Sequence, residues 1–277
     1  MAIINRPSNL FQGGHWYTLD GKSCHKVEGK NGKMRATTLR DARQLGLLPS
    51  VTGIIGMMDK SQLTQWKMRE TAKASIGMDI QPNEDPDTYA DRVIDRAMNQ
   101  VGDAADLGTE IHAALENVLR GAAIECPEHL KVYVSPVIKT LRERGVVVTD
   151  SEKVLVNTDE GFAGQVDALF TWGAPGQPNQ GILDFKTKRT KPDQKVAAYE
   201  SHVLQLAAYA ATHYGAGYLD RVNAVNIFIS TTEPGRIEVV KHDGKRLIEA
   251  WKAFRNLAAV WRFSKRFDPR QTLEVGE

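Results

Sequence analysis

The sequence predicts a mixed α/β fold in which helices flank a central sheet and a helical part precedes it. Three observations carry this prediction. Before residue 146, the longer segments place apolar side chains at helical spacing. From residue 146 to 188, the pattern changes to extended runs bounded by glycine-rich turns. After residue 195, helix-type and strand-type segments alternate, which is typical of a sheet covered by helices.

The composition indicates a globular protein. The chain has 277 residues, 42% of them hydrophobic and 25% charged, which is enough to build a sizeable core. Because the net charge is only +2, binding to a polyanion would depend on local basic patches. The sequence shows no apolar run of membrane-spanning length and no targeting leader at its start. We therefore expect a soluble cytoplasmic protein without membrane contact.

Two groups of cofactors are not expected. Cys24 and Cys126 are too few for a four-cysteine iron–sulfur cluster or zinc site. The phosphate-binding pattern GxxxxGK[ST] is absent from the sequence, so we expect no ATP-driven activity.

We divide the chain into three segments that together form one compact domain. Residues 1–48 predict a lead-in with short strands. Residues 49–145 predict a helical part, in which Ser50 or Thr52 caps the first helix. Residues 146–277 predict the sheet and a C-terminal helix.

The spacing of apolar residues also predicts the individual helices and strands. Further helices are predicted at about 61–73, 88–99, 103–119, 129–144, 196–214 and 244–267. Strands are predicted at 146–148, 153–156, 222–230 and 236–241, and as a pair within 161–188. The clearest helix, 103–119, carries a stripe of Gly108, His112 and Glu116 at intervals of four residues.

The strand pair within 161–188 holds the most informative residues. Asp167 interrupts an apolar run on the first strand, and Asp184 and Lys186 lie one residue apart on the second. Since strand side chains alternate between faces, Asp184 and Lys186 share a face. Buried charge is costly unless it is paired or bound to a metal, so two acids and a lysine suggest a site for a hard cation. Each residue alone would be an ordinary hairpin-edge side chain; the joint pattern favours the site.

This combination suits phosphodiester hydrolysis. Mg²⁺ binds oxygen ligands, commonly one or two carboxylates with water and substrate phosphate completing the shell. A nearby lysine can orient or activate the attacking water, or stabilise negative charge in the transition state. Asp167, Asp184 and Lys186 supply these groups.

Four motifs in order resemble those of the PD-(D/E)XK nuclease superfamily, and within it the RecB-like exonuclease group. They are Gly108-Thr109-Glu110-Ile111-His112, Gly164-Gln165-Val166-Asp167, Asp184-Phe185-Lys186 and Gln205-Leu206-Ala207-Ala208-Tyr209. Upstream, Leu48–Thr52 and Leu63–Lys67 resemble the start of the mitochondrial genome maintenance exonuclease family and its phage relatives. The resemblance covers about residues 48–230. It implies a restriction-endonuclease-like core.

The resemblance also implies roles for individual residues. Asp167 and Asp184 would be metal ligands and catalytic acids, and Lys186 the catalytic lysine. His112 would be a further metal ligand, and the main-chain carbonyl of Phe185 would complete the shell.

Other residues are expected to support the site or bind DNA. Gln205 and Tyr209 would hold the region of the lysine or the nucleic-acid backbone. Glu116 is either an additional acid or a member of a salt bridge on the helix surface. The remaining supporting candidates are Lys188, in a basic segment that borders the site, and Ser50 and Thr52, in the upstream motif.

The expected function is that of a metal-dependent DNA exonuclease in phage or bacterial replication, recombination or repair. Its cofactor would be Mg²⁺, for which Mn²⁺ can substitute. Its substrate would be DNA that is single-stranded or has free ends, and a replication or recombination protein is a possible partner. Two alternatives remain open: an endonuclease or RNA-processing nuclease of the same fold, and a non-catalytic nucleic-acid-binding module. The expected location is the cytoplasm of a bacterium or a phage-infected cell.

Overall fold

A five-stranded mixed sheet forms the centre of the protein in the computed structural model, which describes residues 14–121, 126–173 and 179–272. Its strand order is β5-β6-β7-β8-β9, and all neighbouring strands are antiparallel except the parallel pair β7 and β8. The strands are β5 (Val147–Asn157), β6 (Phe162–Trp172), β7 (Asn179–Lys188), β8 (Asn223–Ser230) and β9 (Ile237–His242). The predicted mixed α/β fold is confirmed at this level.

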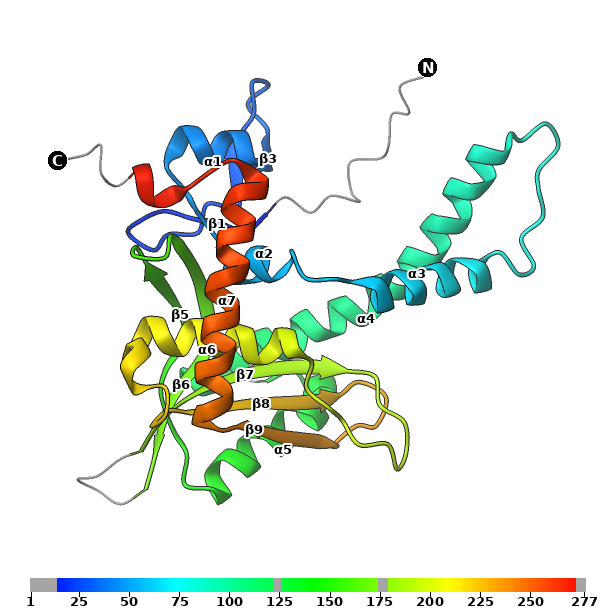
Figure 1. The fold of residues 1–277 in the computed structure, drawn as a ribbon. Helices are drawn as coiled ribbons and strands as arrows, with labels where there is room; N and C mark the ends of the chain where they lie inside the picture. Colours follow the sequence, from blue (N-terminus) through cyan, green and yellow to red (C-terminus); the bar gives the residue numbers. More distant parts are fainter. Residues whose placement is uncertain (1–13, 122–125, 174–178, 273–277) are drawn as a thin grey trace.

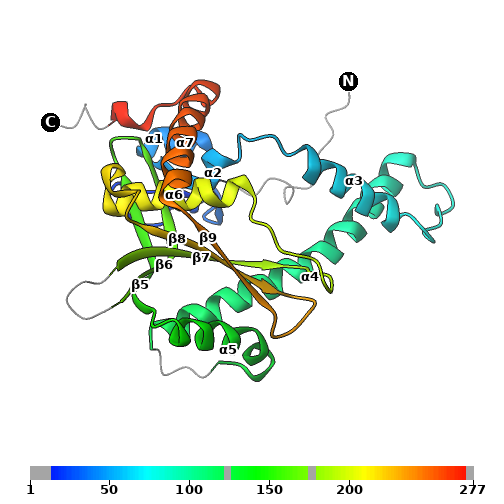
Figure 2. The same ribbon diagram turned by 60° about the horizontal axis from the view of Figure 1, so that its bottom comes forward.

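Helices cover both faces of the sheet (Figure 1). On one face, α6 (Glu200–Tyr214) packs between the sheet and α7 (Gly244–Lys265), with the short α2 (Val51–Ile55) beside them. On the other face lie α5 (Glu128–Glu143) and the C-terminal half of α4 (Pro86–Leu119), as the turned view in Figure 2 shows. Two apolar cores result, one on each side of the strands.

The lead-in packs against the first core. Its short strands are β1 (Trp16–Tyr17), β2 (Lys26–Glu28) and β3 (Met34–Ala36), and β1 pairs with β4 (Leu48–Pro49). The sequence prediction missed helix α1 (Leu39–Leu45), which has a capping box at Thr38 and Asp41 and ends at Gly46 in the left-handed region. This helix is too short for a periodic pattern to stand out. The first thirteen residues of the lead-in lie outside the described residues.

One continuous helix, α4, replaces the two helices predicted at 88–99 and 103–119. Asp85 caps it through its contacts with the main-chain N–H groups of Asp87 and Thr88, and Pro86 occupies its first turn. The intervening sequence contains no proline, and a glycine inside a helix costs only about 1 kcal/mol, so the chain continues as a helix. Its N-terminal half and α3 (Ser61–Ala74) extend away from the body (Figures 1 and 2). We call residues 61–98 the arm.

Strand β5 likewise replaces the two short strands predicted at 146–148 and 153–156. The polar stretch between them stays in the sheet through a register shift after Val148 and a left-handed conformation at Glu152, whose φ is +52°. The remaining elements agree closely with prediction, except that α6 begins at Glu200 instead of residue 196. A short 3₁₀ helix, Pro269–Thr272, follows α7.

No helix among the described residues combines the length and apolar character needed to cross a membrane.

Candidate active site

Strands β6 and β7 place the two acids side by side. The pairing of the two strands ends at Ala168 and Leu183, which are the chain neighbours of Asp167 and Asp184. Beyond this pair, the main-chain N–H of Phe185 donates to Asp167 Oδ2 at 2.7 Å instead of to a main-chain carbonyl. The Asp167 carboxylate therefore takes the place of a strand partner, which fixes it next to Asp184.

Asp184 has both carboxylate oxygens engaged and is only 1% exposed. Lys186 Nζ donates to Oδ1 at 2.5 Å, and Asn226 Nδ2 donates to Oδ2 at 2.7 Å. Asn226 is fully buried and pairs with Asp184 across β7 and β8, and its Oδ1 lies 2.8 Å from His242 Nε2. The sequence analysis missed Asn226; its signal was a polar residue within an otherwise apolar strand.

Burial makes the ionised acids unfavourable. It raises the pKa of Asp167, although the nearby Lys186 charge and the Phe185 N–H oppose the shift. Burial also raises the pKa of Asp184 to about 6, with the Asp167 charge adding to the effect and Lys186 opposing it. Two neighbouring carboxylates, one buried and one partly buried, with a single lysine are an environment that a cation would stabilise.

Helix α4 brings His112 to the acids because it packs closely on β7. A Cβ on Gly108 would lie 2.7 Å from Thr187 Oγ1, so only glycine allows this approach without a shift. One turn further, His112 Nδ1 lies 3.8 Å from Asp167 Oδ2, and its ring meets Phe185 edge-on. Burial lowers the pKa of His112, and the Lys186 charge lowers it further. A neutral imidazole is the form that binds metal.

Gly164 and Tyr209 form the corresponding close contact on the opposite face of the sheet. A Cβ on Gly164 would lie 2.7 Å from Tyr209 Cε1, so the glycine makes room for the ring. Tyr209 is 3% exposed, and Gln205 beside it is 9% exposed. Burial raises the pKa of Tyr209, and a hydrogen bond with Gln205 opposes this. Their burial is compatible with holding the region of the lysine rather than with direct contact to nucleic acid.

Glu152 is a second residue that the sequence analysis missed, and it is an acid close to Asp167. It lies opposite Asp167, between the pairs Ser151–Ala168 and Lys153–Val166, and its Oε2 accepts a hydrogen bond from Gln165 Nε2 at 2.6 Å. Burial raises the pKa of Glu152 to about 7, and the charges of Asp167 and Glu116 contribute to the shift. Antiparallel pairing across the short turn after Asn157 could have placed it there, had β5 been recognised as one strand.

The remaining predicted residues lie around this centre. Glu116 forms an ion pair with Arg120 at 2.7 Å, one of the two alternatives given for it. Lys188 Nζ lies over the ring of Tyr199, 4.6 Å from its centroid. Ser50 caps α2 by accepting from Gly53 N–H at 2.9 Å, and its hydroxyl lies 3.2 Å from that of Thr52. Ser50 also forms a bridge to Ala163 of β6, and Thr52 is exposed.

The described residues contain no cluster of three or more His, Cys, Asp or Glu side chains arranged to hold a metal. A three-side-chain cage is not required for Mg²⁺, which commonly takes one or two carboxylates and completes its octahedron with water and phosphate oxygens. Asp167 and Asp184 meet that requirement in number and chemistry, and their closeness in a largely buried setting fits a cation. The residues present therefore fit the ion that the sequence suggested.

Comparisons with known proteins add little. No family model matches the chain, and no curated protein matches it. One solved structure, described as the crystal structure of SSO0001, aligns with a TM-score of 0.29 and 14% identity over 70% of this chain and 86% of that chain. So low a TM-score supports no argument about fold or function.

Proposed function

We propose that this protein is a metal-dependent DNA exonuclease with a restriction-endonuclease-like core. The observation that carries the proposal is the group formed by Asp167, Asp184 and Lys186. Two carboxylates lie on neighbouring strands, Asp184 buried and Asp167 partly buried, and the lysine ammonium is 2.5 Å from Asp184. The four sequence motifs that resemble the RecB-like group support the same assignment.

Each residue of the group has its own role in this proposal. Asp167, Asp184 and the main-chain carbonyl of Phe185 would hold Mg²⁺ or Mn²⁺, with His112 as a further ligand. The ion would supply Lewis-acid stabilisation of the phosphate and a more acidic bound water. Lys186 then orients the attacking water or stabilises the charge that develops on the phosphate oxygens. Asn226 donates to Oδ2 of Asp184 and Lys186 donates to Oδ1, and these two hydrogen bonds fix the orientation in which the carboxylate would meet the ion.

Features outside the centre support a nucleic-acid substrate with accessible ends. The arm carries Trp66, 42% exposed, on a helix that also contains Lys67, Arg69 and Lys73. Exposed aromatic and cationic side chains suit unpaired bases and their phosphates. Lys188, close to Lys186 on β7, adds a cation beside the proposed cleavage site.

The test uses linear and circular single-stranded DNA of one sequence, the linear form labelled at either end, with Mg²⁺ or EDTA. We expect metal-dependent loss of nucleotides from the ends of the linear form, and an intact circle. Cleavage of the circle would support the endonuclease alternative instead. Parallel RNA substrates test the RNA-processing alternative.

The Asp167→Ala variant, purified in the same way, is the control for contaminating nucleases. Equal cleavage by this variant would show that the activity comes from elsewhere. Binding of DNA without any metal-dependent cleavage by the unaltered protein would favour the non-catalytic module.

A further inference from the structure

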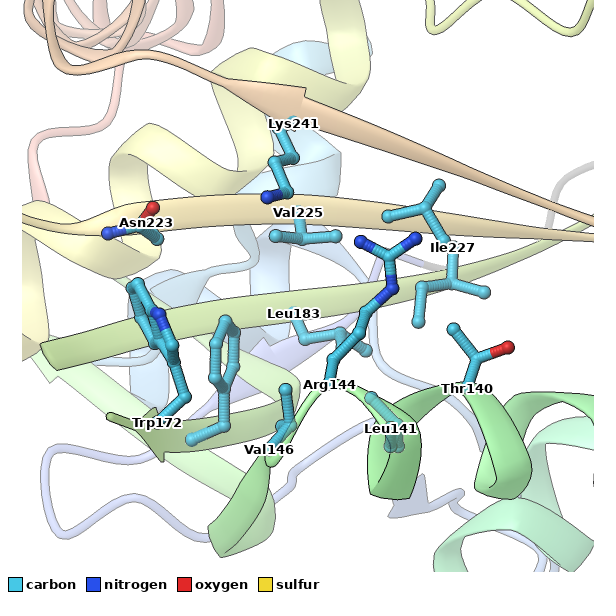
Figure 3. Close-up of a pocket in the computed structure, with 12 residues that line it drawn as sticks. Thr140, Leu141, Arg144, Val146, Trp172, Leu183, Asn223, Val225, Ile227 and Lys241 are labelled. Carbon is cyan, nitrogen blue, oxygen red and sulfur yellow. The ribbon is translucent and has the colours of Figure 1, made fainter. Parts of the chain in front are cut away.

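A recess lies on the face of the sheet opposite Asp184 and Lys186. It is a pocket of about 270 Å³ between the end of α5 and strands β7, β8 and β9 (Figure 3). Its walls are mainly apolar, and its lining includes Leu141, Val146, Trp172, Leu183 and Val225. Leu183 belongs to this pocket while the next residue, Asp184, belongs to the proposed nuclease site. The two sites therefore share a strand, from which Leu183 and Asp184 point to opposite faces of the sheet.

The pocket exists because α5 does not reach across the whole sheet. The helix ends at Glu143, and Gly145, with φ of +62°, turns the chain back into β5. At this end Trp172 and Val239 are only partly buried, while Leu183 and Val225 form the buried floor of the recess. Apolar surface in a recess of this kind favours an apolar occupant.

Two cations face the recess. Figure 3 shows Arg144, from the end of α5, and Lys241, from β9, pointing toward the same space over Val225. Neither side chain has an ion pair or hydrogen bond within the described part of the chain, and none of the described residues lining the pocket is acidic. An occupant that combines an apolar group with a negative charge would match both features.

The size and setting favour a peptide over a larger small molecule. Pockets for drug-sized ligands usually have about 300–1,000 Å³, so 270 Å³ suits one or two side chains instead. The neighbouring β9 is an edge strand of the sheet, so a peptide main chain could lie along it.

We propose that this pocket binds the carboxy-terminal end of an acidic partner protein. A large apolar final side chain enters the recess beside Trp172 and Leu183, and the terminal carboxylate lies between Arg144 and Lys241. Acidic residues upstream of it add long-range attraction to the two cations.

The test measures fluorescence anisotropy of a labelled, aspartate-rich octapeptide that ends in leucine-phenylalanine with a free carboxylate. We expect saturable binding to the full-length protein. Amidation of the terminus, or alanine in place of the final phenylalanine, should weaken binding about tenfold. Arg144→Glu and Lys241→Glu should each weaken it by at least about as much.

Arg142→Glu is the matched control, since Arg142 is an exposed cation on the same helix that does not line the pocket. It should bind the free peptide like the unaltered protein. Absence of saturable binding at millimolar peptide would overturn the proposal, as would equal losses in the Arg142 and Arg144 variants. Equal binding of the amidated peptide would refute the role given to the carboxylate. Binding of decanoate without peptide binding would assign the pocket to a small amphiphile.

None of these measurements uses DNA cleavage. A failure of the nuclease proposal and a failure of this proposal are therefore distinguishable.

Discussion

Strand β7 presents Asp184 and Lys186 to one face of the sheet and Leu183, Phe185 and Thr187 to the other, and the two faces are stabilised differently. On the polar face, Asp184 depends on Lys186 and Asn226 for every hydrogen bond that it accepts among the described residues. The other face is held by packing: Phe185 lies in the second core, and α4 approaches Thr187 closely.

One face of β7 therefore carries the groups proposed for chemistry, and the other face stabilises the fold. The polar face keeps acids whose ionised forms are disfavoured by burial, which is costly for folding. The packed face supplies apolar burial that offsets this cost and holds the strand in place. Substitutions on the polar face should therefore affect chemistry most, and those on the packed face should affect stability most.

The largest effect is expected for Lys186→Ala. Loss of the ammonium removes the group that orients water or stabilises charge, so cleavage of single-stranded DNA should fall about 10²- to 10⁴-fold. Binding of Mn²⁺, measured by calorimetry, should change little. Lys191→Ala, in the loop after β7, is the control and should retain activity. Full activity of the Lys186 variant would refute the assigned role.

Asn226→Ala sharpens the assignment of the polar face. Without its donor, Asp184 Oδ2 loses its hydrogen bond and the carboxylate can rotate, so affinity for Mn²⁺ should fall about 10- to 100-fold. Activity should recover at saturating metal, which would distinguish a misplaced Asp184 carboxylate from a general loss of folded protein. His242→Gln, which can still donate to Asn226, should have a smaller effect than His242→Phe. Unchanged dependence on metal concentration in Asn226→Ala would contradict this role.

Gly108→Ala tests the packed face. The added methyl group would meet Thr187 Oγ1 at 2.7 Å, so α4 must shift, at a cost of about 1–3 kcal/mol in the free energy of unfolding. Activity should fall less than in Lys186→Ala, through displacement of His112. Combining it with Thr187→Ala should restore part of the stability. Gly217→Ala, which meets no atom within 4 Å, is the control in urea unfolding; an equal loss there would rule out the packing explanation.

The smallest effect concerns pH and His202, on α6 facing the polar side of β7. Burial, together with the charges of Lys186 and Lys188, lowers the pKa of His202 to about 4 from its ordinary 6.5. The folded protein therefore binds fewer protons than the unfolded chain between these values, and this group's contribution to stability is lost as pH falls from 6.5 toward 4.

His202→Phe should remove this part of the pH dependence, about 1–2 kcal/mol after allowance for partial exposure. Urea unfolding at neutral pH and at about pH 4.5 measures it. The exposed His129→Gln is the control, and it should keep the pH dependence of the unaltered protein. The same pH dependence in both variants would contradict the explanation.

Local patterns were enough to predict much of the polar face. Alternation on one strand placed Asp184 and Lys186 together, and the short connection between β6 and β7 brought Asp167 beside them. Those relations depend on neighbouring residues in one hairpin, where the period of two and the turn determine the register. The packed helices α5 and α7 followed in the same way from their apolar spacing.

The missed features depend on longer-range packing. Asn226 reaches Asp184 only because β8 lies parallel to β7 after a crossover through α6, a register that no local pattern specifies. Glu152 escaped notice because a left-handed residue inside β5 divides its apolar pattern into two. The continuity of α4 was missed because two separate helices were predicted, at 88–99 and 103–119, whereas the single glycine between them costs little beside the packing on either side.

Because α4 is long, a tilt about Gly108 would move the arm much further than it would move the proposed site. At 1.5 Å per residue, its tip at Pro86 lies about 33 Å from the tight contact at Gly108, whereas His112 lies only about 6 Å beyond that contact. With Gly108 as the fulcrum, a tilt of about 5° would move the tip by about 3 Å and His112 by about 0.5 Å. A large displacement of the arm's tip would therefore go with only a small displacement of the imidazole beside Asp167.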